Sequence, residues 1–444
     1  MDRAAEFVPP GATRALRSDG VERQGRLVRR LGVGDAVVIG AGSMVGAGVF
    51  SVWGAATDAA GTGLLVALAL AGVVALCNAL ASAQLAAIHP ESGGTYVYAR
   101  RQLGPAWGHL AGWGFVVGKT ASCTALALTA GAYLWPEQQR LVGVLAVVAI
   151  TAVNLGGLTR TVAVTRVLLA VTVAVLAACV VAGWSGDATI DRLTPIDADP
   201  GGLLRAAGFL FFAFAGYARI ATLGEEVRDP ARTIPQAIPL ALGAVLALYA
   251  VVGTTVVATL PVATVTSTDA PLRAVVETAG IDALGPVVRV GAGLAALGVL
   301  LNLIPGVSRT VLAMGRRREL PGWFDAVDDR RALPLRAELA VAAVVAVLVA
   351  IVDLRGAIGF SSVTVLTYYA LANASALTLR PPDRRWPHAI AVVGLVGCVA
   401  LAVALPAASV VAGIVVLVAG VVVRALGTRR HGLCHRNRGR PRDL

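Results

Sequence analysis

The chain has 444 residues, of which 57% are hydrophobic and only 14% are charged, against about 25% charged in a typical soluble domain. This composition excludes a soluble enzyme, a disordered chain and a disulfide scaffold. The net charge of +12 does not indicate nucleic-acid binding, because most of the arginines lie in tails and short loops rather than on one basic face. The five cysteines form no CxxC pair, so we expect no metal, no cofactor and no disulfide framework.

Residues 1–33 are polar and rich in arginine, and they lack the pattern of a cleaved signal peptide. After them the chain is a series of apolar runs long enough to cross a bilayer, for which about 20 residues are needed. We place twelve at 34–57, 62–88, 106–135, 141–157, 163–184, 203–223, 235–260, 286–313, 337–353, 356–379, 388–405 and 407–426. The prediction is therefore an all-α integral membrane protein that lies in a lipid bilayer, with a basic tail at 427–444.

The loops between these runs predict the orientation. With the N-terminus inside, 29 basic residues fall in cytoplasmic segments and six in external ones. Since cytoplasmic loops carry the excess of arginine and lysine, we expect both termini to be cytoplasmic. The excess of arginine over lysine, with abundant Ala, Val and Gly, is typical of a GC-rich bacterial genome, so we expect the bacterial inner membrane.

Two of the predicted spans contain sequences that disfavour a continuous helix. Residues 40–48 hold four glycines in mid-membrane, each costing a helix about 1 kcal/mol relative to alanine. Gly42 and Gly46 also fit close helix packing through a GxxxG pattern. A dinucleotide fingerprint is excluded, because position 45 is valine and a membrane span follows. Residues 209–216 gather four phenylalanines and end at Gly216.

The two anomalies stand in spans 1 and 6, five helices apart. This spacing matches an inverted repeat of five plus five helices, whose unwound segments meet near the midplane. Unwound backbone is tolerated there when it lines a cavity. Exposed N–H groups suit a carboxylate and free carbonyls suit an ammonium group, so such a site suits an α-amino acid.

The chain resembles the amino acid–polyamine–organocation family of permeases. The resemblance covers residues 34 to about 380, and 388–426 match only in number and hydrophobicity of helices. Four segments carry it: Gly42–Phe50, Pro90–Arg100, Phe212–Tyr217 followed by Glu225–Pro235, and Ser308–Pro321. The resemblance implies a ten-helix transport core over 34–379, with broken helices 1 and 6, followed by helices 11 and 12.

The resemblance also implies the site. Backbone atoms of Val45, Gly46, Ala47 and Gly48 are expected to bind the carboxylate and amino groups of the substrate. Phe212 is expected to cover the substrate as an aromatic gate, or else to be an ordinary packing aromatic. The carbonyls of the next segment would complete the site, which comprises Ala213, Phe214, Ala215 and Gly216.

Three charged residues beyond the second anomaly are interpreted as a cytoplasmic latch at a helix end rather than as substrate ligands. They are Glu225, Glu226 and Arg232. No acidic residue lies in the middle of a predicted span, so a cationic substrate side chain would lack a buried partner. We therefore expect a small neutral amino acid as the substrate.

Coupling is left open by the sequence. Sodium-coupled members of this fold use hydroxyls midway along helix 8, but 291–301 contain no serine or threonine. Proton-coupled relatives often carry a lysine on helix 5, where this chain has Thr172. The single lysine, Lys119, lies inside the run 106–135. It is a candidate coupling residue that would reach the unwound part of helix 1, or else a structural residue that snorkels to cytoplasmic water or binds helix-end carbonyls.

The resulting hypothesis is a permease that moves an amino acid by alternating access, with proton symport and exchange both open. An exchanger or carrier for a related amine or organic cation is the alternative within transport. A membrane-embedded enzyme is disfavoured, since no HExxH or GxSxG motif occurs.

Overall fold

Every predicted apolar run forms a helix or a pair of helices in the computed structural model, which describes residues 31–89, 93–156, 162–186, 188–194, 198–221, 226–328 and 333–438. The helices are α2 (Val33–Met44), α3 (Gly48–Ala60), α4 (Leu64–Ile88), α5 (Thr95–Gln102), α6 (Pro105–Leu134), α7 (Gln139–Leu155), α8 (Val162–Ser185), α9 (Pro200–Phe214), α10 (Ala218–Ala221), α11 (Pro230–Thr259), α12 (Val262–Thr266), α13 (Pro271–Thr278), α14 (Gly285–Arg316), α15 (Leu335–Ile351), α16 (Leu354–Leu377), α17 (His388–Ala404) and α18 (Ala407–Arg438).

Seven helical segments in the described part of the chain are long and apolar enough to cross a membrane, one of them the joined segment Gly48–Ile88. Three shorter apolar helices, α2, α9 and α17, accompany them. The protein is thus an all-helical, multi-pass membrane protein. Three short helices between the spans, α5, α12 and α13, were not predicted.

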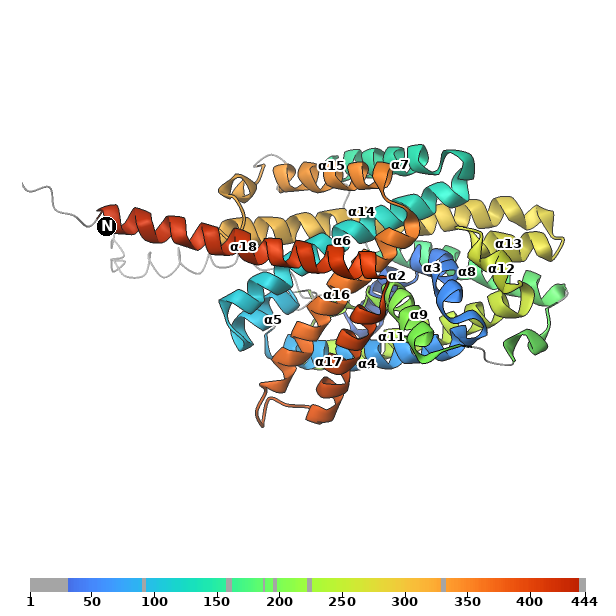
Figure 1. Cartoon of the computed structure of the whole chain (residues 1–444), viewed down its shortest axis with the longest axis horizontal. Coiled ribbons are helices and arrows are strands. Elements are labelled where there is room, and N and C mark those ends of the chain that lie inside the picture. Colours follow the sequence, from blue (N-terminus) through green and yellow to red (C-terminus); the bar gives the residue numbers. More distant parts are fainter. Residues whose placement is uncertain are drawn as a thin grey trace, which may run out of the picture.

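The long helices form a bundle around the short helices α2, α3 and α9 (Figure 1). On one side α15 packs against α7, and α14 packs against α6. On the other side α11 packs against α4, while α16 contacts both α6 and α17. Figure 1 places α5 at one end of the bundle and α12 and α13 at the opposite end. The interior contains large buried aromatic side chains, among them Trp53, Tyr133 and Tyr249.

Five arginines of the predicted external side bind carbonyls at helix C-termini. Each such end leaves up to four carbonyls unpaired and carries a partial negative charge, so a guanidinium group stabilises it. Arg192 Nη1 lies 3.0 Å from the oxygen of Ala258 at the end of α11. The others are Arg140 on Ala350, Arg205 on Ala404, Arg289 on Tyr133 and Leu134, and Arg355 on Thr266. Five of the six basic residues on the predicted external side therefore have a structural role at a helix end.

Candidate functional site

The first span is broken where the glycines predicted an interruption. Helix α2 ends at Met44 and α3 begins at Gly48. Val45 has ψ at 74°, outside the helical range, while its N–H still donates to the oxygen of Ala41 at 2.7 Å. Val45 and Ala47 are buried, so the non-helical backbone lies inside the protein rather than in lipid.

The second break follows Phe214, the last residue of α9, and α10 begins at Ala218. The turn continues through hydrogen bonds of the shorter i→i+3 kind, from Ala215 to Phe212 and from Tyr217 to Phe214. Carbonyls at this end of α9 are therefore released from the regular helical ladder.

The two breaks lie in direct contact, and glycine makes the contact possible. A Cβ atom at Gly216 would lie 2.2 Å from the backbone oxygen of Ser43, at the end of α2. A Cβ atom at Gly48 would lie 2.9 Å from the Cα atom of Ala213. Both distances are far below van der Waals contact, so neither position has room for a side chain. Gly48 thus has a packing role in addition to the backbone role that the resemblance implies.

Gly46 is tightly enclosed from another direction. A Cβ atom there would lie 2.3 Å from Cγ2 of Val299 on α14. The first break is therefore held between α14 on one side and the end of α9 on the other.

Lys119 lies at the second break rather than at the first, and it binds a helix-end carbonyl there, as one of the two alternatives expected. Its ammonium donates a hydrogen bond to the oxygen of Ala215 at 3.1 Å, and the hydroxyl of Tyr369 donates to the same oxygen at 3.2 Å. The side chain is 8% exposed, so it does not snorkel to water. Among the described residues no carboxylate forms a salt bridge with it.

Three of the four phenylalanines of α9 are buried, and the fourth, Phe212, is partly buried. Phe214 is fully buried, and its ring packs 5.1 Å from that of Tyr249. Phe211 packs edge-on against Tyr369 at 5.7 Å. Phe212 is only partly buried and lies near the position that a Cβ of Gly48 would occupy, at 3.6 Å. Phe212 is thus the phenylalanine of this group that lies beside Gly48 of the first break.

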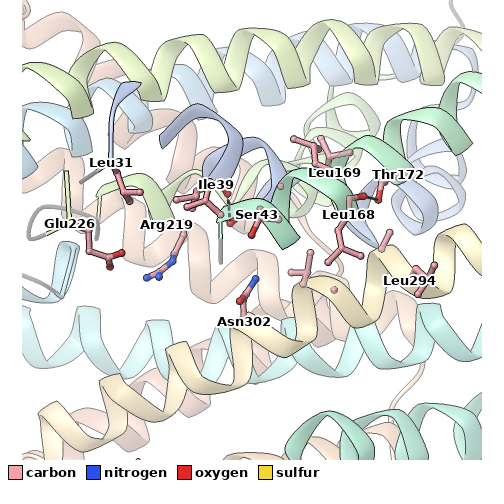
Figure 2. A pocket seen from close by; sticks show the side chains of 17 residues that line it. Leu31, Ile39, Ser43, Leu168, Leu169, Thr172, Arg219, Glu226, Leu294 and Asn302 are labelled. Carbon is pink, nitrogen blue, oxygen red and sulfur yellow. Dashed lines mark hydrogen bonds between the residues drawn. The ribbon is translucent and has the colours of Figure 1, made fainter. Parts of the chain in front are cut away.

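A cavity of about 130 Å³ leads from the first break toward the end of the bundle at which α2 begins. Val45 is one of the residues that line it. Figure 2 shows Ser43, Thr172 and Asn302 around the cavity. Figure 2 shows Arg219 and Glu226 facing the cavity at the end where Leu31 lies. Thr172, which stands where proton-coupled relatives often carry a lysine on helix 5, therefore faces the cavity that leads to the first break.

The structure describes two of the three predicted latch residues, Glu226 and Arg232. Glu225 lies outside the described residues. Glu226 lines the cavity, and its backbone oxygen accepts a hydrogen bond from the N–H of Leu31 at 3.1 Å. Arg232 is exposed on the first turns of α11. The backbone hydrogen bond between Leu31 and Glu226 links the segment before α11 to the start of α2.

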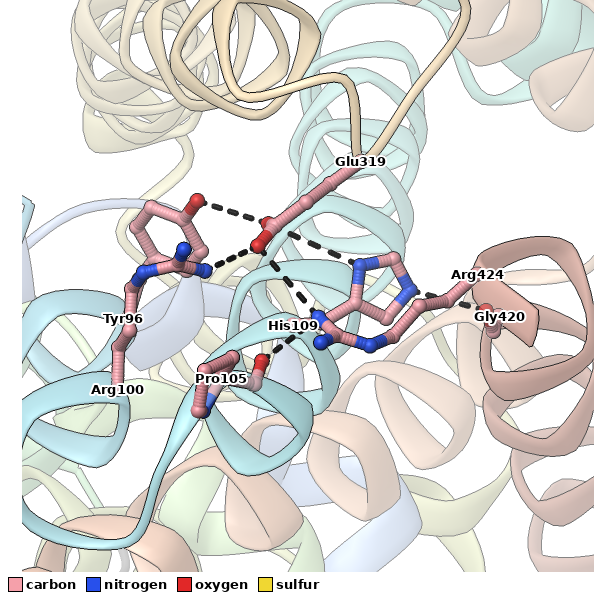
Figure 3. A network of polar contacts seen from close by, with 7 residues as sticks. All are labelled: Tyr96, Arg100, Pro105, His109, Glu319, Gly420 and Arg424. Carbon is pink, nitrogen blue, oxygen red and sulfur yellow. Dashed lines mark hydrogen bonds and ion pairs between the residues drawn. The ribbon is translucent and has the colours of Figure 1, made fainter. Parts of the chain in front are cut away.

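Sequence reasoning missed a second polar cluster, centred on Glu319 in the turn after α14 (Figure 3). Its carboxylate accepts a hydrogen bond from the hydroxyl of Tyr96 at 2.8 Å and pairs with Arg100, both on α5. Arg424 of α18 lies 3.5 Å away, and Nδ1 of His109 on α6 lies 3.8 Å away. Only 7% of the Glu319 side chain is exposed. One carboxylate in the turn after α14 thus contacts side chains of three other helices, α5, α6 and α18.

The pKa of Glu319 is lowered from its ordinary value. Burial alone raises it, but the nearby imidazole of His109, the hydrogen bond from Tyr96 and the charge of Arg100 more than offset that effect. The carboxylate is therefore ionised at neutral pH. No sequence motif pointed to this residue, because its partners come from segments that only the fold brings together.

A further carboxylate was missed near the start of α15. Glu338 is fully buried and lies beside Asn154 of α7, yet neither carboxyl oxygen meets the geometry of a hydrogen bond to another described residue. It lies near the end of its predicted span, not beside the breaks.

Two broken helices in contact inside a bundle of apolar helices, with a cavity leading to the breaks, are the features of a membrane transport protein. The chain belongs to the amino acid permease family, whose sequence model matches residues 35–429. It is 60% identical to a protein of Mycobacterium tuberculosis named as an uncharacterized transporter, over 91% of this chain and 92% of that one. It is 25% identical to a branched-chain amino acid permease of Bacillus subtilis, over 91% of this chain and 94% of the relative.

A vacuolar cationic amino acid transporter of Arabidopsis thaliana is 27% identical, over 81% of this chain and 61% of its own length. The prediction of an amino acid–polyamine–organocation permease is therefore confirmed.

Proposed function

We propose that the protein moves a small neutral amino acid across the bacterial cytoplasmic membrane by alternating access. The observation that carries the proposal is the contact between the two breaks, where Gly216 meets Ser43 and a cavity reaches Val45. Backbone groups freed from both helices are available there to a substrate with one carboxylate and one ammonium group. The substrate site we propose is 45–48 with 212–216.

The choice of a neutral substrate rests on the charges around the breaks. The described residues of the two breaks include no acidic side chain, and the ammonium of Lys119 lies on the oxygen of Ala215. A cationic substrate side chain would be repelled by that ammonium and would find no carboxylate beside it. The name of the Bacillus relative also favours an apolar side chain, whereas the Arabidopsis name favours a cationic one.

The proposed topology has twelve membrane helices, of which the first ten, over 34–379, form a five-plus-five inverted repeat. The cavity lies at the end that carries Leu31 and Glu226, which the charge asymmetry makes cytoplasmic. At the opposite end, Tyr133 donates a hydrogen bond to the oxygen of Phe50 at 2.8 Å and accepts one from the N–H of Leu272. These features support an inward-facing state with its external side closed and both termini cytoplasmic.

Lys119 is the proposed coupling residue. An ammonium that binds a carbonyl of the break can occupy the place of a bound cation, and a buried lysine is able to lose its proton where arginine is not. Proton symport and substrate exchange are the two alternatives for coupling. In a transport assay with membrane vesicles, an exchanger would require counter-substrate inside the vesicles.

The experiment is a thermal-shift screen of the purified protein against the twenty common amino acids. A ligand present at about 100 times its Kd stabilises the folded state by about 2.7 kcal/mol. We expect one or a few neutral amino acids to raise Tm. Stabilisation by lysine or arginine alone would contradict the proposed substrate class, and stabilisation by none of the twenty would contradict the proposed site.

A further inference from the structure

The hydroxyl of Tyr249 lies between the two broken helices. It donates a hydrogen bond to the oxygen of Met44 at 2.8 Å and lies 3.1 Å from the oxygen of Ala213. Met44 is the last residue of α2, and Ala213 lies in the last turn of α9. Tyr249 itself is on α11 and is 1% exposed.

The half-helices that meet at this hydroxyl come from opposite ends of the bundle. Helix α2 begins beside Glu226, whereas α9 begins beside Ala59, at the far end of α3. Each ends at the breaks with carbonyls that lie outside the regular helical ladder and with a partial negative charge. A donor placed between two such ends offsets their mutual repulsion.

A phenol hydroxyl has one proton, so at any moment it can form one strong hydrogen bond with only one of these two oxygens. The ring packs against Phe214, the last residue of α9. The hydroxyl therefore has two alternative acceptors, each belonging to a different half-helix.

We propose that Tyr249 is a positioning residue that couples α2 to α9 during transport. In the present state its hydroxyl holds the two half-helix ends together. When the hydroxyl donates its proton to only one of the two carbonyl oxygens, the half-helix that carries the other oxygen can move. This inference rests on the proposed function, because only a transport cycle requires the two half-helices to separate.

The matched pair of variants is Tyr249→Phe and Tyr368→Phe. Both remove one hydroxyl from a buried ring, but that of Tyr368 accepts a bond from the N–H of Thr95 and does not touch the breaks. Ser43→Cys supplies a thiol that lines the cavity at the end of α2, in a background without the five natural cysteines. The readout is its rate of reaction with N-ethylmaleimide, which needs no substrate.

We expect Tyr249→Phe to label at least threefold faster than the Ser43→Cys background, because the end of α2 is no longer held. Tyr368→Phe should label at the background rate. Fluorotyrosine at position 249 preserves the ring and makes its hydroxyl a stronger donor, so it should label more slowly than the background. Unchanged labelling in Tyr249→Phe, or the same increase in Tyr368→Phe, overturns the proposal.

A kinetic split tests the same role in proteoliposomes, with L-leucine as the probe. Since the hydroxyl acts on the half-helices rather than on the substrate, Tyr249→Phe should lower kcat at least tenfold and change KM less than threefold. A rise in KM with kcat unchanged would assign the hydroxyl to substrate binding and overturn the coupling role. If the wild type transports no amino acid, the proposed function fails, while the labelling result still decides whether the hydroxyl of Tyr249 holds the end of α2.

Discussion

The ammonium of Lys119 donates a hydrogen bond to the oxygen of Ala215, the residue that follows the last turn of α9. This bond brings the single lysine of the chain to the second break. A lysine at the centre of a spanning helix costs about 2.5–3.5 kcal/mol on insertion scales, so its retention requires a compensating interaction. A freed helix-end carbonyl provides one, and it also ties α6 to the part of the protein proposed to bind substrate.

Replacement of Lys119 tests this relationship. Lys119→Met and Lys119→Arg should both impair net uptake and flatten its dependence on pH between 5 and 9, because neither side chain can exchange a proton there. The measurement is initial uptake rate at matched expression. Wild-type rates in Lys119→Met at every pH would show that the lysine takes no part in coupling.

The glycines at the contact of the breaks should not tolerate a side chain. Gly216→Ala places a Cβ atom 2.2 Å from the oxygen of Ser43, and overpacking of this kind costs about 1–3 kcal/mol. We expect a lower Tm and loss of uptake in Gly216→Ala, and loss of uptake in Gly48→Val.

The control for these variants is Gly243→Ala on α11, where an added Cβ would meet nothing within 4 Å. Alanine is favoured over glycine in a helix by about 1 kcal/mol, so this variant should keep or raise Tm. Equal behaviour of Gly216→Ala and Gly243→Ala would refute the contact between the breaks.

Phe212 is expected to cover the occupied site. Phe212→Ala should reduce uptake well beyond any loss of expression, since an occluded site needs a cover that excludes water. Phe115→Ala is the control, because Phe115 packs against Tyr368 rather than beside Gly48. Unchanged uptake kinetics in Phe212→Ala would make it a packing residue only.

The Glu319 cluster should stabilise the folded protein in a pH-dependent way. Its folded-state pKa lies below the unfolded value, so its contribution is present above the unfolded pKa of about 4.3 and is lost as pH falls through the folded pKa. Hydrogen bonds to charged groups contribute about 1.5–3 kcal/mol, so Glu319→Gln should lower Tm at pH 7. The difference between variant and wild type should shrink at lower pH, and a difference that is constant from pH 7 to 3 would contradict the assignment.

The sequence was sufficient for the long helices and for the breaks, because both depend on local composition. Apolar runs of about 20 residues specify spans, and the glycines from Gly40 to Gly48 disfavour a continuous helix whatever surrounds them. The position of the second break followed from Gly216 and the phenylalanines before it. These features are encoded in consecutive residues, so no knowledge of the packing was needed.

The partners of the breaks could not be predicted in the same way. Nothing in the sequence shows that Lys119 binds Ala215, or that Tyr249 lies between Met44 and Ala213, since these pairs depend on how the helices rotate and cross. The Glu319 cluster was missed for the same reason. The short helices α5, α12 and α13 were missed because they are too short and too polar to give a spanning signal.

The measurement that tests the account most directly is uptake of radiolabelled amino acids into proteoliposomes that contain the purified protein. We predict that the wild type accumulates one or a few neutral amino acids, and that Gly216→Ala does not, although Gly243→Ala does. Empty and counter-substrate-loaded vesicles separate net uptake from exchange. Absence of transport of any amino acid under both conditions, or equal transport by Gly216→Ala, would contradict a substrate site at the two helix breaks.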